Sequence, residues 1–313
     1  MVAPASSSAL SSERLVIVTG KGGVGKTAVA TGIASASAQA GLRTVLVTLD
    51  TRDARHPLLD VPLEYQPYRV SAGLAASRVD SLQAVQEYVR RNFPFSSFYE
   101  GFFKTRAFRD FSAAAPGFEE LMCLGKLYDL ASGREFDRVV FDAPATGHMK
   151  LLLEVPGVTL RAVQVGPLNH NARKIQDLIL DSSRTRVVLT TVPEEMAIQE
   201  ALELEAYCRD THRIAVGPLV VNRQVPDRFT STEIAALTSL PEASTNLREA
   251  ITAAANEHEE VQSQRAALEK LGGTGCELLM VPRLVQARVE RHEKAQFVAA
   301  LAEHVSTLVG ART

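Results

Sequence analysis

The sequence predicts an α/β fold in which a mostly parallel sheet is flanked by helices. Residues 14–19 (RLVIVT) form a short apolar run that is followed by a glycine-rich loop and by residues 27–40, a small-residue segment with a helical pattern. Further apolar runs of strand length alternate with helical segments along the chain. Two of these runs end on a carboxylate, Asp50 and Asp142, and in open parallel sheets the carboxyl ends of strands face the ligand crevice.

The loop after the first strand matches the phosphate-binding pattern G-x-x-x-x-G-K-[ST] without a mismatch. It consists of Gly20, Lys21, Gly22, Gly23, Val24, Gly25, Lys26 and Thr27. Its glycines let backbone N–H groups turn toward a phosphate chain, Lys26 supplies a charge for the terminal phosphates, and the Thr27 hydroxyl can bind Mg²⁺. A coincidental glycine-rich turn is the alternative, but the strand–loop–helix context aims amides and a helix dipole at an anion. Nucleotide binding is therefore the first functional prediction.

The second predicted strand, residues 42–49 (LRTVLVTL), ends on Asp50. A carboxylate at this position can orient or activate an attacking water, and the alternative is that it caps the turn that follows. The turn at residues 51–56 (TRDARH) is highly polar, as expected of a segment that responds to a nucleotide.

Between residues 65 and 133 the alternation breaks down, and we expect an inserted helical subdomain with helices at 80–92 and 118–131. Eight of the 12 phenylalanines lie between Phe93 and Phe118. Five aromatic residues recur there at the spacing of one helix face, namely Phe95, Phe98, Tyr99, Phe102 and Phe103. This face is either the core of the subdomain or an apolar docking surface for a hydrophobic client, a partner or a membrane face.

The sheet pattern resumes at residues 136–142 (FDRVVFD). An aspartate that ends a strand beside a phosphate-binding loop usually holds Mg²⁺ through water, so Asp142 is a candidate for that role. The loop after it ends in Thr146, Gly147 and His148, and it can move when the γ-phosphate leaves. His148 either reports that motion or caps a helix that begins near Met149.

The C-terminal half continues the alternating pattern. We predict strands at residues 185–191, 214–222 and 276–281, with helices at 194–210, 246–271 and about 287–308. The last helix carries an apolar stripe beside a polar face of mixed charge, which favours packing against the sheet over a membrane tether.

Composition excludes several classes of protein. The 34 Lys and Arg residues balance 36 Asp and Glu residues, for a net charge of −2, which disfavours general nucleic-acid binding. Residues 1–13 lack the basic start and apolar core of a secretory signal, and we expect a disordered tail. No run reaches the roughly 18 apolar residues of a membrane span. We expect one cytoplasmic domain over residues 14–313, with only indirect membrane contact.

The three cysteines are far apart in sequence. They are Cys123, Cys208 and Cys276, and they form no C-x-x-C motif and have no nearby histidine in ligand spacing. This favours buried, inert thiols over a zinc or iron–sulfur site within one chain. A site shared across a dimer axis stays open, because each cysteine would then count twice.

Taken together, these motifs resemble the family of arsenical-pump-driving and tail-anchored-protein-targeting ATPases, whose deviant phosphate-binding loop serves a dimer. The matching segments, in the family's order and at similar spacing, are GKGGVGKT (20–27), Asp50, PGFEE (116–120), DAPATGH (142–148), PEEMAIQE (193–200), VVN (220–222) and VPRL (281–284). The DAPATGH segment discriminates best, because positioning ATPases of the Min/Par type lack its Thr-Gly-His ending.

The resemblance implies catalytic and switch roles. Lys21, which by itself is an exposed loop cation, is similar to the signature lysine that reaches the partner subunit's nucleotide. Asp50 resembles the switch I residue that positions water, and Asp142 resembles the metal-linked aspartate of switch II. The moving part of switch II would be Thr146, Gly147 and His148.

The resemblance also implies a set of nucleotide-binding residues beyond the loop. Ala28 directly follows the loop, Asn222 is similar to the family's adenine-contacting asparagine, and Pro282 falls in the segment that flanks the base. Glu194 and Glu200 match acidic positions near the nucleotide and the dimer interface.

Three departures from the family pattern matter. The chain reads DTRD at residues 50–53, where the family usually has Asp-Pro-Ala-His, and Ala-Pro-Ala at 143–145, where Thr-Ala-Pro is usual. The zinc-binding C-x-x-C of eukaryotic targeting dimers is absent, and Cys123 is offset from the metalloid-binding cysteines of the arsenic enzymes.

The main functional hypothesis is a Mg²⁺-dependent ATPase that closes as a nucleotide-sandwich dimer, either a homodimer or a heterodimer with a paralogous ATPase. Closure would rearrange the aromatic subdomain to capture or release a hydrophobic protein client. Asp50 would position the water, while Lys26, the partner's Lys21 and Mg²⁺ would stabilise the developing charge. The alternatives are a nucleotide-dependent binding module with little hydrolysis, and a metalloid (arsenite) efflux subunit, which would need converging thiols.

Overall fold

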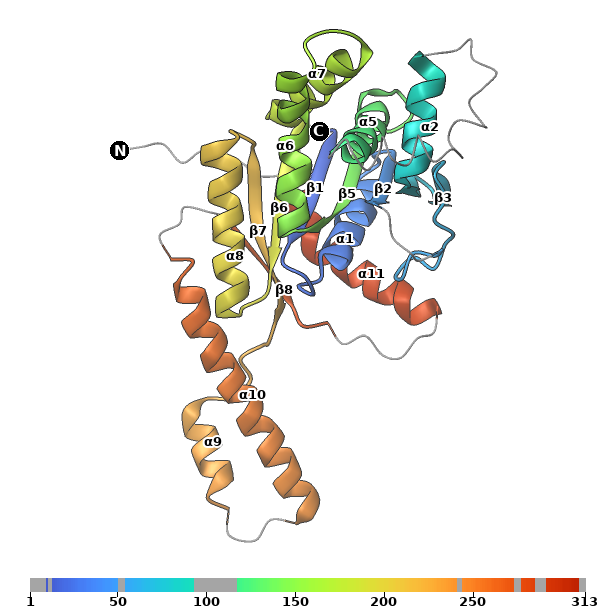
Figure 1. Cartoon of the computed structure of the whole chain (residues 1–313). Helices are drawn as coiled ribbons and strands as arrows, with labels where there is room; N and C mark the ends of the chain where they lie inside the picture. Colours follow the sequence, from blue (N-terminus) through green and yellow to red (C-terminus); the bar gives the residue numbers. More distant parts are fainter. Residues whose placement is uncertain are drawn as a thin grey trace.

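The computed structural model describes residues 10, 13–49, 54–92, 117–240, 244–272, 277–284 and 291–309. These residues form an eight-stranded sheet flanked by helices (Figure 1). The strands are β1 (Leu15–Gly20), β2 (Thr44–Leu49), β3 (Tyr68–Ser71), β4 (Leu74–Val79), β5 (Arg138–Ala145), β6 (Thr185–Thr191), β7 (Val216–Gln224) and β8 (Leu278–Pro282). Their order is β3-β4-β2-β5-β1-β6-β7-β8, and within this sheet only β3 pairs antiparallel with its neighbour. The predicted α/β fold with a mostly parallel sheet is confirmed.

The helices occur mainly where helical spacing predicts them. They are α1 (Lys26–Gln39), α2 (Ser81–Asn92), α5 (Phe118–Ser132), α6 (Thr146–Ala162), α7 (Pro167–Leu180), α8 (Glu195–Ala206) with a π-helical turn (Tyr207–Thr211), α9 (Ser231–Thr238), α10 (Thr245–Glu269) and α11 (Arg291–Val305) with a 3₁₀ turn (Ser306–Leu308). Helix α6 begins at Thr146 rather than near Met149. Figure 1 shows α9 and the first part of α10 extending away from the sheet.

Two hydrophobic cores cover the two faces of the sheet. Side chains of β1 alternate between them, so that Leu15 and Ile17 face one core while Val16 and Val18 face the other. The first core takes its helical side chains mainly from α5, α6, α7 and α8, and the second takes them from α1 and α11.

Helix α11 packs against the sheet, as the mixed charge of its polar face predicts. It contacts α1 so closely that a Cβ atom on Gly32 would lie 3.2 Å from Cβ of Leu301. The final residues are tied to the start of the chain, because Leu10 is fully buried and pairs with Val309. No described helix has the length and apolar character that crossing a membrane requires.

Part of the range for which the sequence predicts a helical subdomain forms strands of the main sheet. Residues 68–79 make up β3 and β4, and β4 pairs in parallel with β2. Neither strand has the apolar β-branched pattern of a typical strand. β3 has only four residues, YRVS, and β4 reads LAASRV. The rest of the described range contains α2 and α5.

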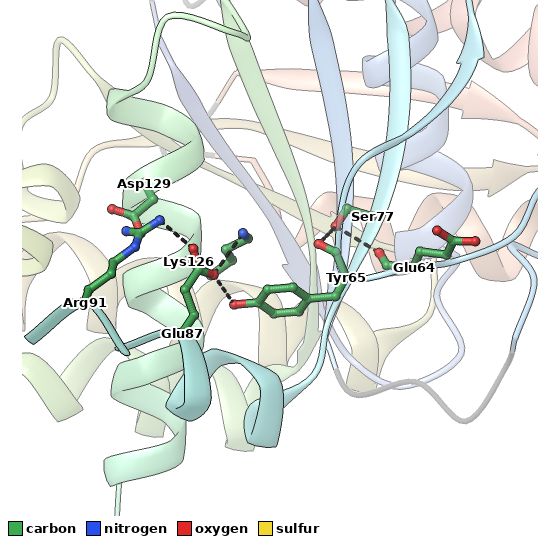
Figure 2. A network of polar contacts seen from close by, with 7 residues as sticks. All are labelled: Glu64, Tyr65, Ser77, Glu87, Arg91, Lys126 and Asp129. Atoms are coloured by element: carbon green, nitrogen blue, oxygen red, sulfur yellow. Dashed lines mark hydrogen bonds and ion pairs between the residues drawn. The ribbon is translucent and has the colours of Figure 1, made fainter. Parts of the chain in front are cut away.

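A cluster of charged side chains fastens α2 to α5 (Figure 2). The Tyr65 hydroxyl donates to Glu87 Oε2 at 2.6 Å, and Lys126 Nζ donates to the same oxygen at 3.0 Å. Arg91 pairs with both Glu87 and Asp129. Burial alone would raise the pKa of Glu87, but the bonds from Tyr65 and Lys126 bring this pKa below its usual value. Glu87 is therefore held in its ionised form, whereas burial raises the pKa of Asp129.

Candidate functional site

The glycine loop at residues 20–27 joins β1 to α1 at the carboxyl edge of the sheet. Gly20 lies so close to β6 that a Cβ atom would be 2.0 Å from the Thr190 carbonyl oxygen. Gly25 has a left-handed φ of 94°, and a Cβ atom there would be 2.3 Å from Nδ2 of Asn222. The chain therefore needs glycine at both positions. The loop leads directly into the N-terminus of α1.

Thr27, Lys26 and Asp142 converge behind the loop. The Thr27 hydroxyl donates to Oδ2 of Asp142 at 2.7 Å, and Nζ of Lys26 donates to the carbonyl oxygen of Lys21 at 3.0 Å. Burial raises the pKa of Asp142 to about 6, against the opposing effects of the Thr27 bond and the Lys26 charge. Burial likewise lowers the pKa of Lys26, which the Asp142 charge opposes. Both groups thus lie in a partly desolvated site where an added charge interacts strongly.

The oxygen atoms at this edge fit Mg²⁺. Three buried hydroxyls, those of Thr48, Thr146 and Thr190, have no hydrogen-bond partner among the described residues. Thr48 lies opposite Asp142 in the pairing of β2 with β5. No group of three or more His, Cys, Asp or Glu side chains in the described ranges could hold a metal by itself. Mg²⁺ usually keeps several waters and takes one or two protein oxygens plus phosphate, which is the donor set available here.

The predicted intersubunit lysine is engaged within its own chain. Nζ of Lys21 lies 2.8 Å from Oε1 of Glu200 on α8, and the two side chains are 36% and 34% exposed. Lys21 is therefore a paired loop cation at the surface. The contact joins the glycine loop to PEEMAIQE, one of the segments that the resemblance singles out.

The switch II residues form the first turn of α6. Ala145 is the N-cap of this helix and no side chain caps it, so the alternative in which His148 caps the helix is wrong. Nε2 of His148 lies 3.9 Å from Oε1 of Glu120 on α5, and the imidazole is about half exposed. A Cβ atom on Gly147 would meet nothing within 4 Å. The first turn of α6 thus has open space at Gly147.

A cavity of about 250 Å³ lies beside the loop and brings the other predicted nucleotide-binding residues together. Among its lining residues are Gly25, Thr27, Ala28, Asn222 and Pro282. Nδ2 of Asn222 donates to the carbonyl oxygen of Val24 at 2.9 Å, so Asn222 is fixed against the loop.

Sequence reasoning missed the apolar walls of this cavity. They come from distant parts of the chain and include Pro57, Leu58, Leu284, Phe297 and Leu301, and the charged residue Arg223 also lines the cavity. The apolar stripe of α11 predicted that Phe297 and Leu301 are inward-facing, but nothing local placed them near the loop. Arg223 has a left-handed φ of 61°, which is uncommon for a residue with a side chain and carries no sequence signal.

Several predicted residues lie outside the described residues. They are Asp50 with residues 51–53, the aromatic set Phe95, Phe98, Tyr99, Phe102 and Phe103, and Cys276. The two described cysteines, Cys123 and Cys208, are both buried, as the sequence predicts.

Comparisons with known proteins agree with this site. The family described as "Anion-transporting ATPase" matches residues 13–166. "ATPase BagA" of Mycobacterium tuberculosis is 29% identical over 247 residues, which cover 73% of this chain and 70% of that protein.

Two further relatives match shorter stretches. "Arsenical pump-driving ATPase" of Escherichia coli is 28% identical over 203 residues, covering 58% of this chain and 34% of that protein. "ATPase ASNA1 homolog 1" of Paramecium tetraurelia is 26% identical over 149 residues, covering 46% of this chain and 44% of that protein. The matched segment carries the glycine loop and Asp142, and the described structure joins them through the hydrogen bond between Thr27 and Asp142, beside the cavity that Thr27 and Asn222 line. The chain therefore contains a P-loop ATPase domain that is similar to the anion-transporting ATPase family over residues 13–166.

Proposed function

We propose that this ATPase binds MgATP at the glycine loop, closes as a dimer around the nucleotide, and uses the cycle to capture and release a hydrophobic protein client. The observation that carries the nucleotide assignment is the convergence of Thr27, Asp142, Asn222 and Pro282 on one edge of the sheet. These residues come from α1, β5, β7 and β8, so the site depends on the whole sheet.

The amide of Asn222 supports adenine as the base. Its nitrogen is committed to the Val24 carbonyl at 2.9 Å, and its oxygen makes no hydrogen bond to a described residue. An amide oxygen accepts a hydrogen bond, and adenine offers an exocyclic amino group where guanine offers a carbonyl. The cavity would therefore prefer ATP to GTP.

The loop supports in-line attack of water on the γ-phosphate. Loop amides and Lys26 would hold the phosphates, Asp50 would orient the water, and Lys21 of a second subunit would reach the transferred group. When bound to Thr27 and, through water, to Asp142, Mg²⁺ would supply positive charge to the β- and γ-phosphates. Homodimer and heterodimer are both compatible with this arrangement, because it requires only that the second subunit supply a lysine.

The position of α6 supports coupling to a client. The switch II residues Thr146 and Gly147 begin this helix, and its exposed positions include the apolar residues Leu151 and Val158. Exposed Val165 follows the end of the helix. A movement of switch II on loss of the γ-phosphate would displace these apolar side chains together, which gives a route from hydrolysis to the release of an apolar segment.

Asp50→Asn tests the proposal. This variant should bind MgATP as the wild type does but release phosphate at least about 100-fold more slowly, because a positioned group is lost only from the transition state. It should accumulate as an ATP-bound dimer in light scattering, and its copurifying proteins should carry hydrophobic tail segments. Lys26→Ala, which weakens nucleotide binding itself, is the control and should remain monomeric. Wild-type turnover by Asp50→Asn would remove Asp50 from the mechanism, and an ATP-bound monomer would contradict the dimer.

A further inference from the structure

Residues 54–63, which follow the predicted switch I segment, form a loop that is closed by its own backbone hydrogen bonds. The N–H of Leu63 donates to the carbonyl oxygen of Ala54 at 2.9 Å, and the N–H of His56 donates to that of Val61 at 2.9 Å. These cross-links close residues 54–63 into a compact unit whose tip contains Pro57, Leu58 and Leu59. The unit can therefore present a side chain at its tip in a fixed position.

His56 fixes the tip from inside. The side chain is 1% exposed, and its Nδ1 accepts the N–H groups of Leu58 at 3.3 Å and Leu59 at 3.1 Å. Because Nδ1 accepts, the proton of the neutral ring is on Nε2. Burial lowers the pKa of His56 to about 4, so the ring keeps this accepting form at neutral pH.

Leu58 separates two cavities. On one side it lines the cavity of about 250 Å³ that also contains Asn222 and Pro282. On the other side it lines a cavity of about 320 Å³, together with Leu59 and Val298. Leu59 lines only the second of these two cavities. Two neighbouring leucines on one turn thus differ in whether they face the nucleotide side.

The nucleotide-side cavity has the composition of a pocket for a flat heterocycle. Its polar groups include the Asn222 amide, beside Thr27 and Arg223, and its walls include the apolar side chains of Leu58, Leu284 and Phe297. A purine base combines apolar faces with a polar edge, and a pocket that binds it needs apolar surface for the faces and one or two aligned polar groups for the edge. Leu58 supplies such a surface from the segment that follows switch I.

We propose that Leu58, held in place by His56, packs on the adenine base of the bound nucleotide and sets the affinity that the base contributes. This inference rests on the proposed function, in which the loop binds the phosphates and the adjoining cavity takes the base. It adds a specificity residue from the segment that follows Asp50 in the chain. The unit at residues 54–63, which would carry this base contact, begins only three residues (51–53) after Asp50, the proposed water-positioning carboxylate.

The affinities of the full chain for two ligands, measured separately, distinguish contact with the base from contact with the phosphates. MgATP carries the base, whereas magnesium tripolyphosphate carries only the phosphate chain. In titration calorimetry, Leu58→Ala should weaken MgATP binding about tenfold, because the apolar surface that Leu58 would place against the base is removed. Its affinity for tripolyphosphate should stay within about twofold of the wild type. Leu59→Ala, the same substitution one residue along the turn, should leave both affinities within that range.

Leu58→Met provides a second variant that keeps an apolar side chain of similar volume, and it should bind MgATP within about threefold of the wild type. Unchanged MgATP binding by Leu58→Ala would overturn the inference, as would an equal loss of both ligands. An equal loss of MgATP binding by Leu59→Ala would also contradict it, because that residue does not line the nucleotide-side cavity. Failure of the wild type to bind MgATP would instead contradict the proposed function, so the two failures are distinguishable.

Discussion

At the scale of single residues, two side chains shape the site by holding backbone. Asn222 bonds to the carbonyl of Val24, and it occupies the space that a side chain at position 25 would need. His56 accepts two backbone N–H groups and thereby fixes the turn that carries Leu58. In both cases a buried side-chain atom bonds to the main chain, so the loss of either side chain would leave backbone groups unpaired, although Nε2 of His56 itself has no partner among the described residues.

The protonation of His56 predicts an acid-sensitive fold. Burial lowers its pKa from 6.5 to about 4, so between these pH values the unfolded chain binds a proton that the folded chain excludes. Stability is unaffected by this group above pH 6.5 and falls as the pH drops toward 4, by about 2 kcal/mol between pH 7 and pH 5.

His56→Gln keeps an acceptor at this position but does not titrate. The free energy of unfolding in urea, measured at pH 7 and pH 5, should therefore fall by about 2 kcal/mol less in this variant than in the wild type. His170→Gln replaces an exposed histidine and should follow the wild-type pH dependence. Parallel pH profiles for His56→Gln and the wild type would show that His56 is protonated in the folded chain.

At the scale of elements, local patterns predicted most of the sheet but missed two strands, β3 and β4, and two helices, α7 and α9. Six strands occur where the sequence predicts them, and in β1, β2, β5, β6 and β7 the apolar runs are largely buried on both faces, whereas the edge strand β8 is only partly buried. The short β3 and the alanine-rich β4 lack that pattern, and β4 becomes a strand by pairing with β2.

The missed helices carried signals that were available in the sequence. Helix α7 begins with Pro167 at its first position, and α9 begins with a capping box in which Thr230 and Glu233 exchange hydrogen bonds. The cavity wall is different, because Phe297 and Leu58 are far apart in sequence and only the packing of α11 brings them together. Motifs could thus predict the phosphate side of the proposed site and, through Asn222 and Pro282, part of its base side, but not the apolar wall.

We predict strong energetic coupling between the charges of Lys126 and Glu87 in the cluster that joins α2 to α5. Lys126 is 7% exposed and pairs with Glu87, so Glu87→Gln would leave a buried ammonium without its counter-charge. We expect this variant to lose about 3 kcal/mol of unfolding free energy. Adding Lys126→Met removes the stranded charge and should recover most of the loss.

Urea denaturation of the two single variants, the double variant and the wild type gives the coupling energy. Glu260→Gln is a matched control, because Glu260 pairs with Arg283 at the exposed surface and should cost at most about 1 kcal/mol. A loss in Glu87→Gln no larger than that of the control would mean that the cluster is solvated and does not fasten α2 to α5.

At the scale of the whole molecule, the site is assembled from both halves of the chain. The family match covers residues 13–166 and therefore contains the glycine loop and Asp142, whereas Asn222, Pro282 and Phe297 come from beyond it. In the proposed function, phosphate binding draws on the matched segment, whereas base binding draws on both parts of the chain, because Leu58 lies within the match. The contact between Lys21 and Glu200 also joins the two halves, and it lies at a surface that a second subunit would approach in the proposed dimer.

The Lys21–Glu200 ion pair predicts the energetics of that assembly. If Lys21 reaches the partner's nucleotide, its 2.8 Å contact with Glu200 must first break, and a half-exposed pair of this kind contributes up to about 1 kcal/mol. Glu200→Gln removes this cost and should tighten the ATP-dependent dimer about two- to fivefold. Sedimentation equilibrium of the Asp50→Asn chain in MgATP, with and without Glu200→Gln, measures the change. Glu195→Gln lies on the same helix, pairs with Lys270, and should leave the dimer unchanged. A weaker dimer in Glu200→Gln would show that Glu200 binds the partner rather than restraining Lys21, since the loss of an intramolecular competitor can only favour association.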